Sequence, residues 1–175
     1  MKEQLAVARW GVVLSLLTLL YGYGLGMVFG GAEEMLRSRL SAGGATWVEA
    51  QVQSGKDRAT AEAASAKVVE KSWAYMKRAH LHANGLGTSA LALIMLLAFL
   101  GVTVNRLRFT ALALGVGALG YSTFWMIAGF MAPGMGSTGD AKEALTFMAG
   151  PSALLCVGGL LSVLAAAIAS ARGPR

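Results

Sequence analysis

Charged and apolar residues are separated into long blocks along this chain. Four stretches contain no Asp, Glu, Lys or Arg, namely residues 10–32, 79–105, 109–139 and 144–171. Each stretch can hold the roughly 20 apolar residues that a membrane-spanning helix needs. The pattern therefore predicts a single all-α integral membrane domain, residues 1–175, built as a four-helix bundle. The spans that we predict cover about residues 10–31, 78–103, 109–132 and 143–170.

One long polar segment, residues 32–77, separates the first two predicted spans. Its alanine-rich part, residues 58–71, favours helix. Turn-forming residues at Ser41–Gly44 and Ser54–Gly55 predict breaks in that helical structure. We expect amphipathic extramembrane helices here that cap the bundle, with Trp47 and Trp73 anchored at the lipid headgroups.

The composition supports this assignment, because 55% of the 175 residues are hydrophobic and only 14% are charged. The net charge of +6 does not indicate a nucleic-acid partner, since the cations gather at the ends of the apolar stretches as membrane-edge anchors do. If the four helices alternate, one side of the membrane carries Lys2, Arg9, Arg106, Arg108, Arg172 and Arg175. The other side carries nine cations, from Arg37 to Arg78 with Lys142, against eight acids, and we favour cytoplasmic termini.

Glycines repeat every four residues in the first predicted span, at Gly22, Gly26 and Gly30. They form a smooth seam along one helix face, and another helix or a flat ligand can approach the backbone closely there. Tyr23 flanks the seam and can donate a hydrogen bond. Ordinary helix packing explains such a seam equally well.

The chain's two histidines, His80 and His82, lie where the polar segment meets the second apolar stretch. An ionisable group near hydrocarbon is costly, which makes both candidates for a functional site. On a helix, Asn84 lies about 40° from His80 and Gly87 about 20° away on its other side. Because His82 points about 160° away from His80, the two cannot serve one site from the same helix, although His82 of a neighbouring subunit could. Gly87 leaves room for a flat ligand beside His80, although a histidine can also simply mark the membrane interface.

The third predicted span concentrates small, polar and aromatic residues, with Gly115, Gly117 and Gly120 followed by the run Tyr121–Met126. One face of this helix is expected to line a pocket, with helix packing as the alternative interpretation. Its aromatic members include Tyr121 and Trp125.

With these segments in order, the chain resembles the styrene-oxide isomerase family of small four-helix membrane enzymes. The matching segments are Thr18–Leu25 with Gly30–Gly31, Trp73, Arg78–His80, Gly120–Ser122 and Gly139–Asp140. The resemblance covers all four spans in the same order, and the polar segment is longer here. It implies a homotrimer in a bacterial inner membrane that binds haem b between neighbouring subunits.

The resemblance implies that His80 is the axial ligand of the haem iron. From their positions on the predicted helices, Arg78, Gly87 and Trp125 are further candidates to contact the haem. In that family, ferric iron acts as a Lewis acid on a small hydrophobic epoxide of the styrene oxide type, and a 1,2-shift then gives the aldehyde. Three family positions differ: Leu86 replaces an asparagine, Ile127 a tyrosine and Leu119 an acid. The candidates to replace those groups in catalysis are Asn84, Tyr121 and Tyr23.

Other functions remain open at this stage. A haem b cytochrome for electron transfer usually holds its iron with two strong ligands, whereas the two histidines here face apart. Gas or redox sensing and a haem-free membrane scaffold are further alternatives. Cations at helix ends, Lys77, Arg78, Arg106 and Arg108, are candidates to pair with haem propionates, although membrane-edge charges need no such role.

Overall fold

The computed structural model describes residues 2–172 and is entirely helical over that range. Its elements are α1 (Lys2–Gly31), α2 (Glu33–Gln53), α3 (Arg58–Phe99), α4 (Val104–Met135), α5 (Thr138–Ala144) and α6 (Thr146–Ala171). Helices α1, α3, α4 and α6 are each long and apolar enough to cross a membrane. The prediction of an all-α fold with four candidate spans is therefore confirmed. The cation Arg175 lies outside the described residues.

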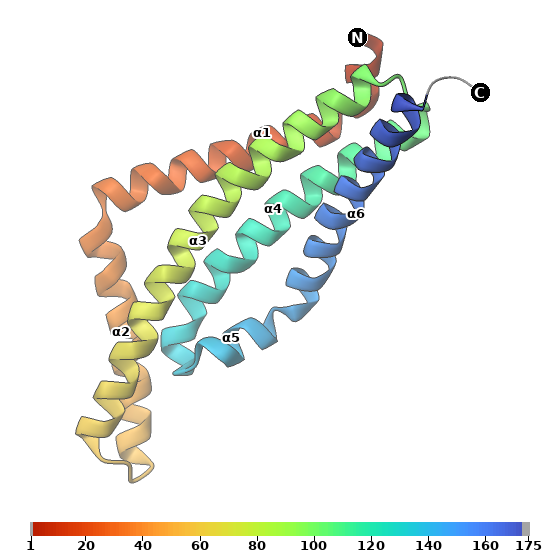
Figure 1. Cartoon of the computed structure of the whole chain (residues 1–175). Coiled ribbons are helices and arrows are strands. Elements are labelled where there is room, and N and C mark those ends of the chain that lie inside the picture. Colours follow the sequence, from red (N-terminus) through yellow and green to blue (C-terminus); the bar gives the residue numbers. More distant parts are fainter. Residues whose placement is uncertain (1, 173–175) are drawn as a thin grey trace.

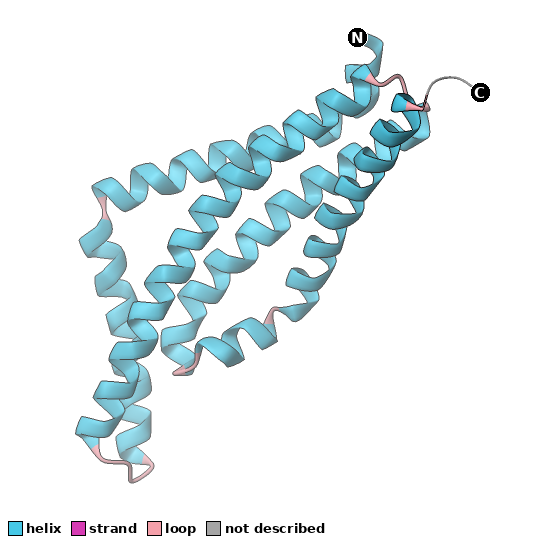
Figure 2. Ribbon diagram, in the orientation of Figure 1, coloured by secondary structure: helices cyan, strands magenta, loops and turns pink. Residues whose placement is uncertain are grey.

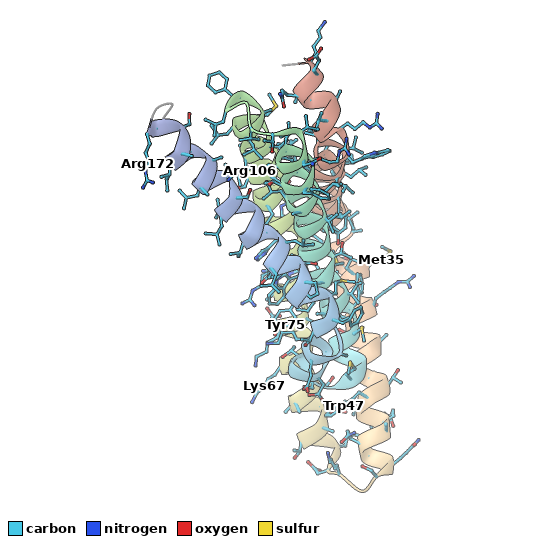
Figure 3. The ribbon with its side chains drawn as sticks, turned by 90° about the vertical axis from the view of Figure 1, so that its right-hand side faces the viewer. Met35, Trp47, Lys67, Tyr75, Arg106 and Arg172 are labelled. Carbon is cyan, nitrogen blue, oxygen red and sulfur yellow. The ribbon has the colours of Figure 1, made fainter. Side chains whose placement is uncertain are left out.

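The other three long helices, α1, α3 and α6, pack around α4 (Figure 1). Helix α1 packs against both α3 and α4, whereas α6 packs mainly against α4. The described ends of the chain and the α3–α4 turn lie at one end of the molecule, and α2 and α5 extend at the other (Figure 1). Figure 3 places Arg106 and Arg172 at the first of these ends and Trp47 and Lys67 toward the second.

Helix α3 is much longer than its apolar part. Its 42 residues span about 63 Å, whereas a bilayer's hydrocarbon core is about 30 Å thick. Its first part, residues 58–77, packs against α2, and the two form a helical hairpin that we call the polar arm. The connections between helices are short turns (Figure 2).

Helix α2 continues through Ser41–Gly44, so the break predicted there is wrong. Gly44 is buried, and a Cβ atom added to it would lie 2.5 Å from the Ser65 hydroxyl oxygen and 3.1 Å from a Val69 methyl carbon. The glycine therefore permits close packing of the two arm helices instead of ending one of them. The chain does leave the helical conformation after Gln53, near the predicted Ser54–Gly55 break.

Trp73 is only 3% exposed, so its predicted role as a headgroup anchor is wrong. Its ring packs edge-on against Phe29 of α1, with centroids 5.3 Å apart. Trp47 packs against Gly136, which ends α4 with φ +65°. Both tryptophans thus join the polar arm to the spans.

Only part of the predicted glycine seam packs against another helix. A Cβ on Gly22 or Gly26 would collide with side chains of α3, but a Cβ on Gly30 would meet nothing within 4 Å. Closer to the N-terminus, Gly11 lies directly against the Ala111 backbone of α4. Helix α1 is therefore held by close backbone contact with two helices.

The N-terminal end of α4 is bound to α6 by polar side chains. Arg106 donates to the Ser162 carbonyl at 2.5 Å, and the Thr110 and Ser162 hydroxyls lie 2.9 Å apart. The last predicted span corresponds to α6, which begins at Thr146 just after the chain bends at Leu145.

We predict that Gly11→Leu destabilises the protein, because the new side chain must displace the α4 backbone. Overpacking of this kind costs about 1–3 kcal/mol. Gly30→Leu, the same substitution on the same helix, should have little effect. Thermal denaturation in detergent measures both. Equal melting temperatures for the two variants would contradict the proposed α1–α4 contact.

The end of the polar arm should loosen in acid. The Thr60 backbone N–H and hydroxyl both donate to Asp57, which holds the pKa of that carboxyl below its usual 3.8. Arg58 donates twice to Glu49, which holds the pKa of Glu49 below its usual 4.5. Because both folded-state pKa values are lowered, the stabilisation is present above the usual values and is lost as the pH falls through the lowered ones.

We expect hydrogen-exchange protection factors at residues 54–62 to fall between pH 7 and pH 3, while those around Ile94 in the buried core of α3 are retained. Asp57→Ala should reproduce part of the loss at pH 7, because it removes the α3 cap. If the protection factors at residues 54–62 are unchanged both at pH 3 and in Asp57→Ala, the Asp57 and Glu49 hydrogen bonds do not stabilise the end of the arm.

Candidate functional site

His80 lies on the face of α3 that packs against α1. Its Nδ1 atom is 2.8 Å from the Gly22 carbonyl oxygen. A carbonyl oxygen only accepts hydrogen bonds, so Nδ1 carries the proton and donates it. In the neutral ring, Nε2 then keeps its lone pair. An imidazole oriented through one nitrogen by a backbone carbonyl is the usual arrangement of a metal-binding histidine.

Glycines on α1 make this approach possible. A Cβ on Gly26 would lie 2.8 Å from the His80 Cε1 atom, and a Cβ on Gly22 would lie 2.7 Å from the Asn84 Oδ1 atom. Any larger residue at either position would push α3 away. The predicted seam therefore holds the imidazole of His80 and the amide of Asn84 in place.

Asn84 lies one turn beyond His80, behind the imidazole. Its Nδ2 atom donates to the His80 carbonyl at 3.1 Å and lies 3.2 Å from His80 Nδ1. Its Oδ1 atom is buried without a hydrogen-bond partner in the described part of the chain. Asn84 thus bonds to the α3 backbone at His80, whereas the ring itself is oriented by the Gly22 carbonyl.

An open pocket of about 420 Å³ adjoins His80. Helices α1, α2 and α3 line it with Gly26, Phe29, Glu33, Arg37, Trp73, Lys77, His80 and Leu81. The Phe29 ring lies 6.1 Å from the His80 ring, between centroids. The pocket therefore combines one oriented imidazole, aromatic walls and two cationic side chains.

Within residues 2–172, no group of three or more His, Cys, Asp or Glu side chains could hold a metal ion by itself. A single imidazole beside aromatic walls instead fits a metal whose other ligands come from a macrocycle, as in haem. The donor set at His80 is therefore suited to a prosthetic group.

His82 faces the other way, as the 160° separation predicts. Its ring lies 5.2 Å from that of Tyr121 and 6.1 Å from that of Trp125, both on α4. Its Nδ1 atom lies 2.8 Å from the Arg78 carbonyl oxygen, so its Nε2 also keeps a lone pair. Arg78 covers the rings of Tyr75 and Trp125, at 5.4 and 5.1 Å from their centroids. Tyr75 is labelled in Figure 3.

Of the other predicted site residues, the structure places Asn84 beside His80. Arg78, Tyr121 and Trp125 belong to the His82 cluster on the α3–α4 face. These three residues and the His80 pocket lie on different faces of the protomer.

The other two predicted site residues, Tyr23 and Gly87, do not line the His80 pocket. Tyr23 is 64% exposed on the outer face of α1. The open space predicted beside Gly87 is absent, because Leu19 of α1 fills it, 3.0 Å from the position of an added Cβ. Gly87 thus serves helix packing in this protomer.

The sequence prediction missed the contribution of α2 to the pocket. Arg37 and Glu33 lie four residues apart and form an ion pair at 2.7 Å, a spacing that was visible in the sequence. Nothing in the local pattern placed that pair beside His80. Lys77, which the sequence already offered as a candidate propionate partner, lies three residues before His80 and lines the same pocket.

Comparisons with protein-family models, curated proteins and solved structures find no match to this chain.

We predict that the neutral His80 ring is protonated at Nδ1. With His82 replaced by Ala, the one remaining ¹⁵N-labelled histidine should show a protonated Nδ1 and an unprotonated Nε2 in NMR spectra at pH 8. Gly26→Ala should change those shifts by displacing the ring, whereas Gly24→Ala should not, since a Cβ there meets nothing within 4 Å. An Nε2-protonated ring would refute the assignment.

Proposed function

We propose that this chain is a haem b-binding membrane protein that isomerises small hydrophobic epoxides of the styrene oxide type to aldehydes. The observation that supports this most is the His80–Gly22 hydrogen bond, which leaves Nε2 of His80 free beside an aromatic pocket. The resemblance to styrene-oxide isomerases at Arg78–His80 and along α1 supports the same proposal.

The residues around His80 fit a haem group. Gly26 lets the imidazole lie directly against α1, because a Cβ there would come within 2.8 Å of the His80 Cε1 atom. Phe29 and Trp73 offer apolar ring surfaces, and Arg37 and Lys77 lie at the same pocket. His80 would hold the haem through Nε2. The pocket is open, so it would supply one wall of a larger site.

When bound, ferric haem would supply a Lewis acid for the epoxide oxygen. The protein's own residues have three tasks. The Gly22 carbonyl keeps the His80 ring in one orientation and one tautomer, and Asn84 donates to the backbone carbonyl of His80. Phe29 and Trp73 offer an apolar surface to a substrate without charges. His82 faces α4, so each protomer offers one imidazole at this pocket.

We propose that the protein acts as a homotrimer in a bacterial inner membrane, with cytoplasmic termini and the polar arm outside the bilayer. A neighbouring subunit would close the open side of the His80 pocket. Tyr121, Trp125 and Tyr23 lie away from that pocket in the protomer, so they can contribute to catalysis only across such an interface.

We predict that His80→Ala abolishes retention of haem b, because it removes the one imidazole at the pocket. His82→Ala is the matched control and should retain haem. The measurement is the Soret absorbance of protein purified from haem-supplemented cells. Product analysis after incubation with styrene oxide should find the aldehyde for wild type and His82→Ala only.

Three results would contradict the proposal. Loss of haem with His82→Ala alone would assign the ligand to the other histidine. A low-spin, six-coordinate spectrum without aldehyde formation would indicate an electron carrier. Purified protein with no Soret band, under conditions that load haem into other membrane proteins, would indicate a haem-free scaffold.

A further inference from the structure

We propose that Lys77 and Arg37 form the carboxylate-binding end of the His80 pocket and hold the propionates of the bound haem. This inference rests on the proposed haem function, and it assigns a direction to the group. The carboxylate edge would face the polar arm, and the apolar edge would face the spans.

Lys77 is placed to reach the same ligand as His80. It lies three residues earlier on α3, about 60° around the helix, and both side chains line the one pocket. Among residues 2–172, no carboxylate forms an ion pair with Lys77. Its positive charge is therefore available to an anionic ligand.

Arg37 reaches the pocket from α2 and is fixed in position. Its Nε atom donates to Glu33 at 2.7 Å, its Nη1 atom lies 3.6 Å from Glu70, and its guanidinium lies over the Trp73 ring, 4.6 Å from the centroid. These contacts leave its second amino group without an ion-pair partner in the described chain. The remaining amino group can donate a charge-assisted hydrogen bond to a carboxylate oxygen of a ligand.

Among the residues that line the pocket, cations outnumber carboxylates. Its lining holds one carboxylate, Glu33, and two cations, Arg37 and Lys77. Glu33 pairs with Arg37, so the charge of Lys77 is not balanced within the lining. A neutral epoxide does not require cations in its binding site, whereas a haem carries two carboxylates on one edge.

The remaining lining is apolar or aromatic, with Gly26, Phe29, Trp73 and Leu81. A ligand that matches the whole pocket needs a flat apolar body, an atom that binds an imidazole nitrogen, and an anionic edge. Membrane-edge lysines and arginines without a ligand role would show no such selectivity for an anionic edge. This difference provides the test.

The experiment titrates haem-free protein in detergent with ferric haemin and with haemin dimethyl ester, whose propionates are uncharged, and follows the Soret band. The Arg37→Gln/Lys77→Gln double variant should bind haemin about tenfold more weakly than wild type, in the range of partly exposed charge pairs. Its affinity for the ester should be unchanged. The ratio of the two affinities is compared between proteins, which removes the different partition of the two haemins into detergent.

Lys71→Gln is the matched control, because Lys71 is exposed on the same helix and does not line the pocket. It should bind both haemins as wild type does. A double variant that still discriminates haemin from its ester as wild type does would overturn the role of Lys77 and Arg37 and leave haem binding intact. If wild type binds neither haemin, or if His80→Ala binds both as wild type does, the proposed haem site fails as well.

Discussion

The hydrogen bond between His80 and the carbonyl of Gly22 determines how the rest of the site is built. It requires the backbone of α1 to come within reach of a side chain on α3, which is possible only because Gly22 and Gly26 carry no side chain there. The same approach places Asn84 behind the ring and Leu19 against Gly87. One close helix contact therefore fixes the imidazole and uses up the space on one side of it.

Helix α3 separates two sets of polar and aromatic groups. On one face, His80 and its pocket lie against α1 and α2. On the other, His82 lies among Tyr121, Trp125 and the Arg78 side chain. Both histidines keep a free Nε2 atom, but only His80 donates its Nδ1 proton to a carbonyl of another helix and adjoins the open pocket. The surroundings, rather than the histidine itself, distinguish the two positions.

The polar arm has a part in the site as well as in the fold. Trp73 is buried against Phe29, and the guanidinium of Arg37 lies over its ring. Packing of α2 on α3 thus brings charged side chains to a pocket whose other walls are apolar. Trp47 against Gly136 ties the same arm to α4, so the pocket's charged end is joined to the spans at two places.

The sequence by itself determined the all-helical class and the four candidate spans, because a stretch without charges long enough to cross a bilayer is a local property. It also determined that His80 and His82 face apart and that Asn84 shares the face of His80, because helical periodicity is local too. The tertiary structure decided which of these groups meet. Gly87 packs against Leu19, Tyr23 points outward, and Arg37 reaches His80 from a separate helix. Each of these outcomes depends on which helix lies opposite, and neither periodicity nor composition along one segment contains that information.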